Sequence, residues 1–159
     1  MDKMKNMNNI LAMVTFLYSF IVYILTMAPT TSFWDCGEFI AIAFKLEVSH
    51  PPGAPLFMLI GRLFSFLSFG DVTKVAYWVN MSSVLASALT ILFLYWSIVM
   101  LGRKVLQAKV GEETDLQKIL LAGAGAVGAL AFTFTDSFWF SAVEGEVYAM
   151  SSFFTAVVF

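Results

Sequence analysis

The sequence predicts an all-α membrane protein, a polytopic bundle of spanning helices with short interfacial helices in its first loop. Hydrophobic residues make up 60% of the 159-residue chain, charged residues only 13%, and the mean hydropathy is +0.84. A soluble domain is about 45–50% apolar and about 25% charged, so this chain lacks the polar surface that a core in water needs. The apolar residues also form long uncharged runs, as membrane-spanning helices do.

Composition also excludes some classes of function. The chain has 9 Lys and Arg against 11 Asp and Glu, and it contains no basic block that could hold a nucleic-acid backbone. We therefore expect no nucleic-acid partner. The single cysteine, Cys36, can form neither an internal disulfide nor a four-cysteine zinc site.

The first predicted span covers residues 10–28, an almost wholly apolar run about as long as a helix needs to cross a ~30 Å hydrocarbon core. The run ends in Met27-Ala28-Pro29 rather than in an Ala-x-Ala cleavage site. We therefore expect a retained helix rather than a cleaved signal peptide.

Residues 29–74 are predicted to form the first extramembrane loop, because charged residues return there and all 4 prolines lie there. Gly37–Leu46 is predicted to be a short helix that ends before the proline-rich turn at residues 50–55, since proline disfavours helix at the residue before it. Residues 55–70 are apolar, but Arg62 in their middle would cost about 2.5–3.5 kcal/mol at the bilayer centre. We therefore expect an interfacial or re-entrant helix there rather than a spanning one.

Residues 75–102 carry no charge and are long enough for a tilted second span, and a third span is predicted at residues 119–135. Polar loops are predicted at residues 103–118 and 136–146. The last run, residues 147–159, covers only about 20 Å as a helix, so we interpret it as a fourth span that is cut short. All 159 residues are accordingly expected to be the amino-terminal part of a longer polytopic protein.

The third run contains Gly123, Gly125 and Gly128, which have the glycine spacing of a dinucleotide-binding loop. That loop follows a strand in a soluble domain, whereas these glycines lie inside an apolar run and alternate with alanines. Close packing of membrane helices through small residues is the favoured interpretation.

The positions of Lys and Arg predict the orientation, because cytoplasmic loops carry an excess of them. Most of them fall in the amino-terminal segment and the 103–118 loop, namely Lys3, Lys5, Arg103, Lys104, Lys109 and Lys118. We therefore expect a cytoplasmic amino terminus, with the acid-rich segments 29–74 and 136–146 together on the exoplasmic face.

Asp35 and Glu38 are the strongest candidates for catalytic residues. They are three residues apart, so they share a helix face if the helix begins near Trp34. Partial desolvation among the neighbouring aromatic side chains would raise a carboxylate's pKa and make it a useful base. The alternative is a pair of acids that complement the dipole at a helix amino terminus.

Two other groups of residues leave alternatives open. His50, the only histidine, is either a structural hydrogen-bonding group beside a Pro-Pro turn or a donor to a substrate phosphate oxygen. In the second loop Asp136, Glu144 and Glu146 lie among aromatic residues without a basic neighbour. A solvated loop explains these charges, but it does not require the aromatic residues beside them.

Three motifs resemble a known family: Ser32 to Ile40 (SFWDCGEFI), His50 to Phe57 (HPPGAPLF) and Phe138 to Tyr148 (FWFSAVEGEVY). In this order they resemble the amino-terminal half of a bacterial multipass family, formerly a domain of unknown function and now grouped with glycosyltransferase family 117. The animal members of that family are protein O-mannosyltransferases. The resemblance covers essentially the whole chain, and it extends to the GT-C plan of membrane glycosyltransferases, in which an acidic motif precedes a His-Pro-Pro-like turn.

The resemblance implies transfer of a sugar from a polyprenyl-phosphate donor to an exported protein, through Ser or Thr hydroxyls, or to a glycan. It implies a bilayer location in a bacterial inner membrane, with an exoplasmic active site and a fragment that is inactive alone. By position, Asp35 is the implied catalytic carboxylate and Glu38 its partner. A divalent cation is left open and no other cofactor is expected. The implied substrate-binding residues are His50, Pro51, Pro52, Lys45, Arg62, Glu144, Glu146 and Tyr148.

A non-catalytic membrane subunit or a transporter component is the competing class. Transporters place ionisable residues near the bilayer midplane, whereas the three long predicted spans are free of charge. The pattern therefore favours chemistry at the membrane surface over passage through the membrane. An assembly subunit stays open, and the full-length reading frame would discriminate, since further spans and an exoplasmic domain favour the transferase.

Overall fold

A computed structural model of the chain describes residues 2–107 and 113–159, with side chains from Met7 onward. The described residues form helices and no strand, so the predicted all-α class is confirmed. The bounds of the elements are α1 (Asp2–Thr26), α2 (Cys36–Lys45), α3 (Pro55–Ser65), η1 (Phe66–Ser68), η2 (Val72–Lys74), α4 (Val75–Val105), α5 (Asp115–Thr133), α6 (Asp136–Val143) and α7 (Val147–Val158).

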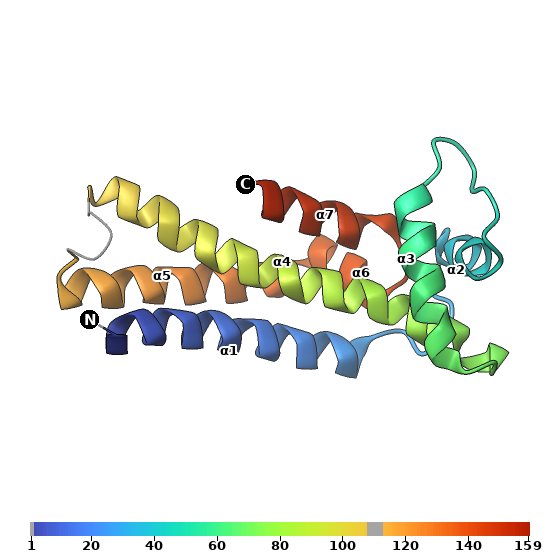
Figure 1. Cartoon of the computed structure of the whole chain (residues 1–159), viewed down its shortest axis with the longest axis horizontal. Coiled ribbons are helices and arrows are strands. Elements are labelled where there is room, and N and C mark those ends of the chain that lie inside the picture. The colour runs from blue at the N-terminus through green and yellow to red at the C-terminus, as the bar shows by residue number, and fades with distance from the viewer. Residues whose placement is uncertain (1, 108–112) are drawn as a thin grey trace.

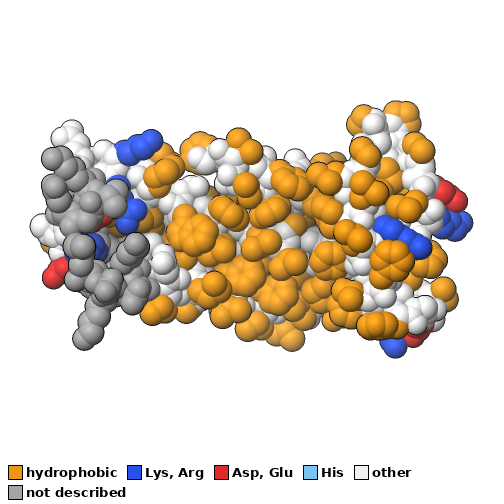
Figure 2. All heavy atoms as spheres, in the orientation of Figure 1, with side chains coloured by type: hydrophobic (Ala, Val, Ile, Leu, Met, Phe, Trp, Pro, Cys, Tyr) orange, Lys and Arg blue, Asp and Glu red, His pale blue; other side chains and the backbone are white. Residues whose placement is uncertain are grey.

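Three helices, α1, α4 and α5, lie side by side along the long axis of the molecule (Figure 1). Their apolar stretches, Met7–Thr26, Val72–Val105 and Asp115–Thr133, are long enough to cross a membrane. On the face shown in Figure 2, hydrophobic side chains cover the middle of the molecule, and charged side chains gather at its two ends. These features confirm a helical membrane bundle, and α7 is a shorter apolar helix of 12 residues.

Helix α4 lies at the centre of the bundle, where it packs against α1, α5 and α7. Its contact with α5 depends on glycine. A Cβ atom at Gly125 would lie 2.9 Å from Val99 Cγ2, and one at Gly128 would lie 2.7 Å from Ile98 Cδ1. Gly125 and Gly128 thus serve close helix packing, which supports that interpretation over the dinucleotide-binding one, whereas Gly123 has no atom within 4 Å of an added Cβ.

Helices α2 and α3 lie at one end of the bundle, and α3 runs across the long helices rather than along them (Figure 1). They pack closely, because a Cβ atom at Gly61 of α3 would lie only 2.9 Å from Ala43 Cβ of α2. The crosswise course is the one expected of an interfacial segment. Helix α2 ends at a left-handed residue, Leu46, before the proline-rich turn.

The predicted polar loop at residues 136–146 is wrong in part, because eight of its residues form α6. The helix buries Phe138 and Ala142, which lie one turn apart on the same face. The charged residues at both ends of the segment are typical of a loop, which is why the sequence predicts one. Burial of one apolar face nevertheless stabilises a helix between them. Only residues 144–146 link α6 to α7.

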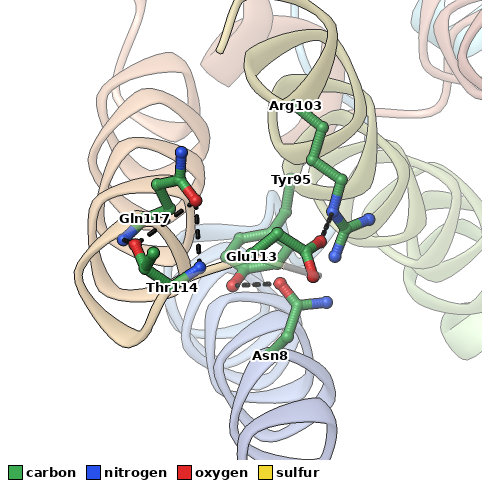
Figure 3. A network of polar contacts seen from close by, with 6 residues as sticks. All are labelled: Asn8, Tyr95, Arg103, Glu113, Thr114 and Gln117. Atoms are coloured by element: carbon green, nitrogen blue, oxygen red, sulfur yellow. Dashed lines mark hydrogen bonds and ion pairs between the residues drawn. The ribbon is translucent and has the colours of Figure 1, made fainter. Parts of the chain in front are cut away.

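The opposite end of the bundle is held by a polar network that reaches into the predicted 103–118 loop (Figure 3). Tyr95 Oη of α4 donates to Asn8 Oδ1 of α1 at 3.1 Å, and Arg103 pairs with the buried carboxylate of Glu113 at 2.8 Å. Thr114 and Gln117 form a capping box that begins α5. Lys109 and the side chains of Lys3 and Lys5 lie outside the described residues.

Candidate functional site

Two linkers meet at the end of the bundle that carries α2 and α3. One joins α1 to α2, and the other, residues 144–146, joins α6 to α7. The Ala28 amide donates to the carbonyl of Val143 at 2.9 Å, and the Ser32 hydroxyl donates to the Glu144 carboxylate. These bonds bring the two acid-rich motifs together, although more than a hundred residues separate them in sequence.

Asp35 lies at the tip of the first linker, directly before α2. The sequence places it on a helix face with Glu38 if the helix begins near Trp34, but α2 begins at Cys36 and Asp35 is the residue that caps it. The Asp35 carboxylate makes no capping hydrogen bond, and the residue is exposed. The preceding Trp34 has φ +60 and is 91% exposed, a strained backbone for a bulky residue.

Glu38 is paired with His50 across the loop. The backbone amide of His50 donates to Glu38 Oε1 at 3.0 Å, and its Nδ1 lies 3.0 Å from the same oxygen. These two hydrogen bonds lower the pKa of Glu38, the backbone one most, and the carboxylate in turn raises the pKa of His50. Among the described residues, none forms a hydrogen bond with His50 Nε2, which leaves the outer edge of the ring available.

The second linker carries a buried carboxylate. Glu146 is 8% exposed, and burial is the main cause that raises its pKa, with smaller contributions from the charges of Glu144 and Asp35. The charge of Asp35 also helps to raise the pKa of His50. Asp35 therefore lies within electrostatic reach of both His50 and Glu146, so the site joins both motifs.

The two basic residues that are predicted to bind substrate contact other groups of the loop. Lys45 Nζ lies 3.9 Å from Glu47 Oε1, and both side chains are exposed. The Arg62 guanidinium donates to the carbonyl of Phe44 and lies 4.7 Å from the centre of the Phe66 ring. Within the described part of the chain, neither cation bonds to Asp35, Glu38 or His50.

The remaining predicted site residues lie close in sequence to these groups. Pro51 and Pro52 are exposed and joined by a cis peptide bond in the turn that carries His50. Tyr148 lies in the first turn of α7, two residues after Glu146, and is 60% exposed. Across residues 2–107 and 113–159, no group of three or more His, Cys, Asp or Glu side chains is arranged to hold a metal ion.

Sequence reasoning missed Asn80, which lies in α4 beneath the two linkers. Its side chain is fully buried, and its amide donates to the carbonyls of Ala28 and Thr30 at 2.8 and 2.9 Å. The signal that could have found it is a lone carboxamide in an uncharged spanning run, since a polar group inside a membrane helix needs a partner.

Comparison with known proteins gives consistent matches. Residues 35–159 match the family model described as protein O-mannosyl-transferase TMEM260 N-terminal domain. The protein O-mannosyl-transferase tmem260 of Dictyostelium discoideum is 27% identical over 143 residues, which are 90% of this chain and 15% of that protein. The Mus musculus protein O-mannosyl-transferase TMEM260 is 29% identical over 141 residues, 86% of this chain and 17% of that protein. No solved structure matches the chain significantly.

Proposed function

Because the chain belongs to the protein O-mannosyl-transferase TMEM260 N-terminal domain family, we propose that it forms part of a membrane glycosyltransferase that modifies proteins. The two curated relatives above are both named protein O-mannosyl-transferases, and the chain spans less than a fifth of each. The proposal therefore concerns the complete protein. We assign it to the GT-C type and to glycosyltransferase family 117 on the three motifs that resemble them.

The donor in this proposal is a polyprenyl-phosphate sugar, and the acceptor is a Ser or Thr hydroxyl of an exported protein. A lipid donor presents its phosphate at the membrane surface. The site fits that location, because its acids lie in α2 and in the linkers before α2 and after α6, outside the three candidate spans. The multi-pass topology, the cytoplasmic amino terminus and the bacterial inner membrane are part of the same proposal, and Lys and Arg positions support the orientation.

The observation that carries the proposal is an exposed carboxylate, Asp35, within electrostatic reach of the Glu38–His50 pair. Asp35 takes the proton of the acceptor hydroxyl as that oxygen bonds to the anomeric carbon. The bond from the anomeric carbon to the phosphate oxygen breaks, and the polyprenyl phosphate leaves with the electron pair. General-base assistance of this kind contributes about 10²–10⁴-fold to a rate.

His50 stabilises the departing phosphate in this scheme. Glu38 holds Nδ1 and favours the charged imidazolium, so Nε2 carries a proton that can be donated to a phosphate oxygen. His50 then makes a structural hydrogen bond to Glu38 through Nδ1 and binds the phosphate through Nε2, so the two interpretations of this residue are compatible. Lys45 lies 3.9 Å from Glu47, and the Arg62 guanidinium donates to the carbonyl of Phe44. Among the described residues, neither cation bonds to Asp35 or Glu38, so we assign the phosphate contact to His50.

In this proposal Glu144, Glu146 and Tyr148 take the acceptor side of the site, and Pro51 and Pro52 take the side of the donor phosphate. Glu144 and Glu146 come from the second motif and lie in the same electrostatic cluster as Asp35. Tyr148 presents an exposed ring two residues further on. Pro51 and Pro52 shape the turn that carries His50.

The test is a transfer assay with the purified complete protein, a polyprenyl-phosphate mannose and a Ser/Thr-containing peptide. Mannose is the first sugar to try because both relatives are named for it. Mass spectrometry should detect a peptide that carries one hexose, and none when the donor lipid lacks its sugar. A folded protein that transfers no sugar from any polyprenyl-phosphate donor would contradict the proposal and favour a non-catalytic membrane subunit.

A further inference from the structure

One buried side chain connects both acid-bearing linkers to the bundle. Asn80 lies in the second turn of α4, inside the candidate span Val72–Val105, and no part of it is exposed. Burying a carboxamide is costly unless its hydrogen bonds are made. The partners of Asn80 therefore decide whether it is tolerated there.

The amide nitrogen of Asn80 binds the linker that leads to Asp35. Its two N–H groups donate to the carbonyls of Ala28 and Thr30, at 2.8 and 2.9 Å. Both amide protons are thereby used, and two backbone positions of the linker are joined to a rigid helix. The same linker also binds the end of α6 through the Ala28 amide and the carbonyl of Val143.

The amide oxygen of Asn80 contacts the other two segments of the site. It lies 3.9 Å from the thiol sulfur of Cys36, the buried residue directly after Asp35. A Cβ atom at Gly145 would lie only 2.8 Å from the same oxygen and 3.3 Å from Ile40 Cγ1. Gly145 stands between Glu144 and Glu146, so the absence of a side chain there lets the second motif approach Asn80.

We propose that Asn80 is a positioning residue that holds Asp35 opposite Glu144 and Glu146. It touches the segment before Asp35, the residue after Asp35 and the residue between the two glutamates. Asn80 does not reach the reacting atoms, and it acts by fixing the spacing of the carboxylates from a helix that the membrane holds. This inference rests on the proposed function for its kinetic consequence but not for its geometry.

The first test compares Asn80→Ala with Ser83→Ala in the complete protein. Ser83 lies one turn further along α4, is also fully buried, and its hydroxyl has no hydrogen-bond partner among the described residues, so its loss should be neutral. For Asn80→Ala we expect kcat to fall at least about tenfold while the KM for the donor lipid changes less than about twofold. For Ser83→Ala both constants should stay within about twofold of the wild type.

A second readout does not depend on activity. Cys36 is buried against Asn80, so its reaction with a membrane-permeant maleimide, followed on its own peptide by mass spectrometry, reports local opening of the site. We expect Asn80→Ala to speed this labelling about tenfold or more and Ser83→Ala to leave it unchanged. A general loss of folding would instead speed labelling at buried positions throughout the protein.

Gly145→Ala provides an independent route to the same contact. Its added methyl group should displace Asn80 and reproduce both effects, whereas Gly123→Ala, which has no atom within 4 Å of the added carbon, should not. The double variant Asn80→Ala/Gly145→Ala should lose less than the sum of the two single variants, because the clashing oxygen is gone. If Asn80→Ala does not fold, Gly145→Ala decides the question by the same measurements.

Unchanged kcat and unchanged Cys36 labelling in folded Asn80→Ala would overturn the positioning role. An additive double variant would overturn the contact with Gly145. If the wild-type protein transfers no sugar, the proposed function fails, whereas faster Cys36 labelling in Asn80→Ala would still support the structural part of this inference.

Discussion

Replacing Asp35 by Asn tests the residue on which the transferase proposal depends. The change is nearly isosteric and removes the proton acceptor. Asp35 is exposed and makes no capping hydrogen bond, so the folded state loses only its charge near the amino terminus of α2. Such an interaction contributes about 0.3–1 kcal/mol, and we expect expression and membrane insertion to be preserved.

The loss of activity should be far larger than the loss of stability. If Asp35 is the base, transfer should fall about a hundredfold or more, which corresponds to about 2.7 kcal/mol on the barrier. The variant should also lower the pKa of both His50 and Glu146, because the charge of Asp35 helps to raise them. Glu38→Gln should cost less, about tenfold, since Glu38 acts through His50.

The assay measures glycopeptide formation by purified complete protein across a range of pH. Asp136→Asn is the control, because Asp136 is also an exposed acid at the amino terminus of a short helix. It should keep its activity within about twofold of the wild type. Normal transfer by folded Asp35→Asn, or an equal loss in Asp136→Asn, would show that the Asp35 carboxylate only complements a helix terminus.

Two further predictions concern orientation and pH. A cysteine placed at exposed Val48 should react with an impermeant maleimide added outside intact cells, whereas a cysteine at Gln107 should not. The reverse labelling pattern would mean that the topology is inverted. Since burial raises the pKa of Glu146 above 4.5, the folded form holds its proton more tightly than the unfolded chain, so the free energy of unfolding falls as pH rises through the raised value. Glu146→Gln should therefore raise the thermal midpoint of the purified protein at about pH 8 but not at about pH 4, and an equal change at both would contradict this reasoning.

The helices of the membrane bundle could be predicted from the sequence because lipid imposes a simple constraint on backbone polar groups. Long uncharged runs at residues 10–28 and 75–102 correspond to α1 and α4, and the small residues around Gly125 correspond to close packing with α4. Arg62 in a short apolar run correctly separated crosswise α3 from the spanning helices (Figure 1). Each of these inferences uses only local composition.

The contacts that build the site could not be predicted in this way. The bond from Ser32 to Glu144 joins residues 112 apart, and the two carbonyls that accept from the Asn80 amide lie 52 and 50 residues away. Periodicity within one segment gives no information about which distant segment it meets. The pairing of Glu38 with His50 likewise depends on the path of the turn between them.

Two features of the acidic residues of the site support the proposed function: they lie outside the spanning helices, and one of them destabilises the fold by being buried. Residues 75–102 and 119–135 carry no charge, whereas ionisable residues inside membrane spans mark the substrate and ion pathways of many transporters. Glu146, by contrast, is buried beside two other carboxylates, and no Lys, Arg or His in the described part of the chain pairs with it. A buried carboxylate without a cation destabilises a fold. An amide of the same size would avoid this cost, so the carboxylate is consistent with the proposed role of Glu146, in which it binds a hydroxyl of the acceptor, and a purely structural position does not require it.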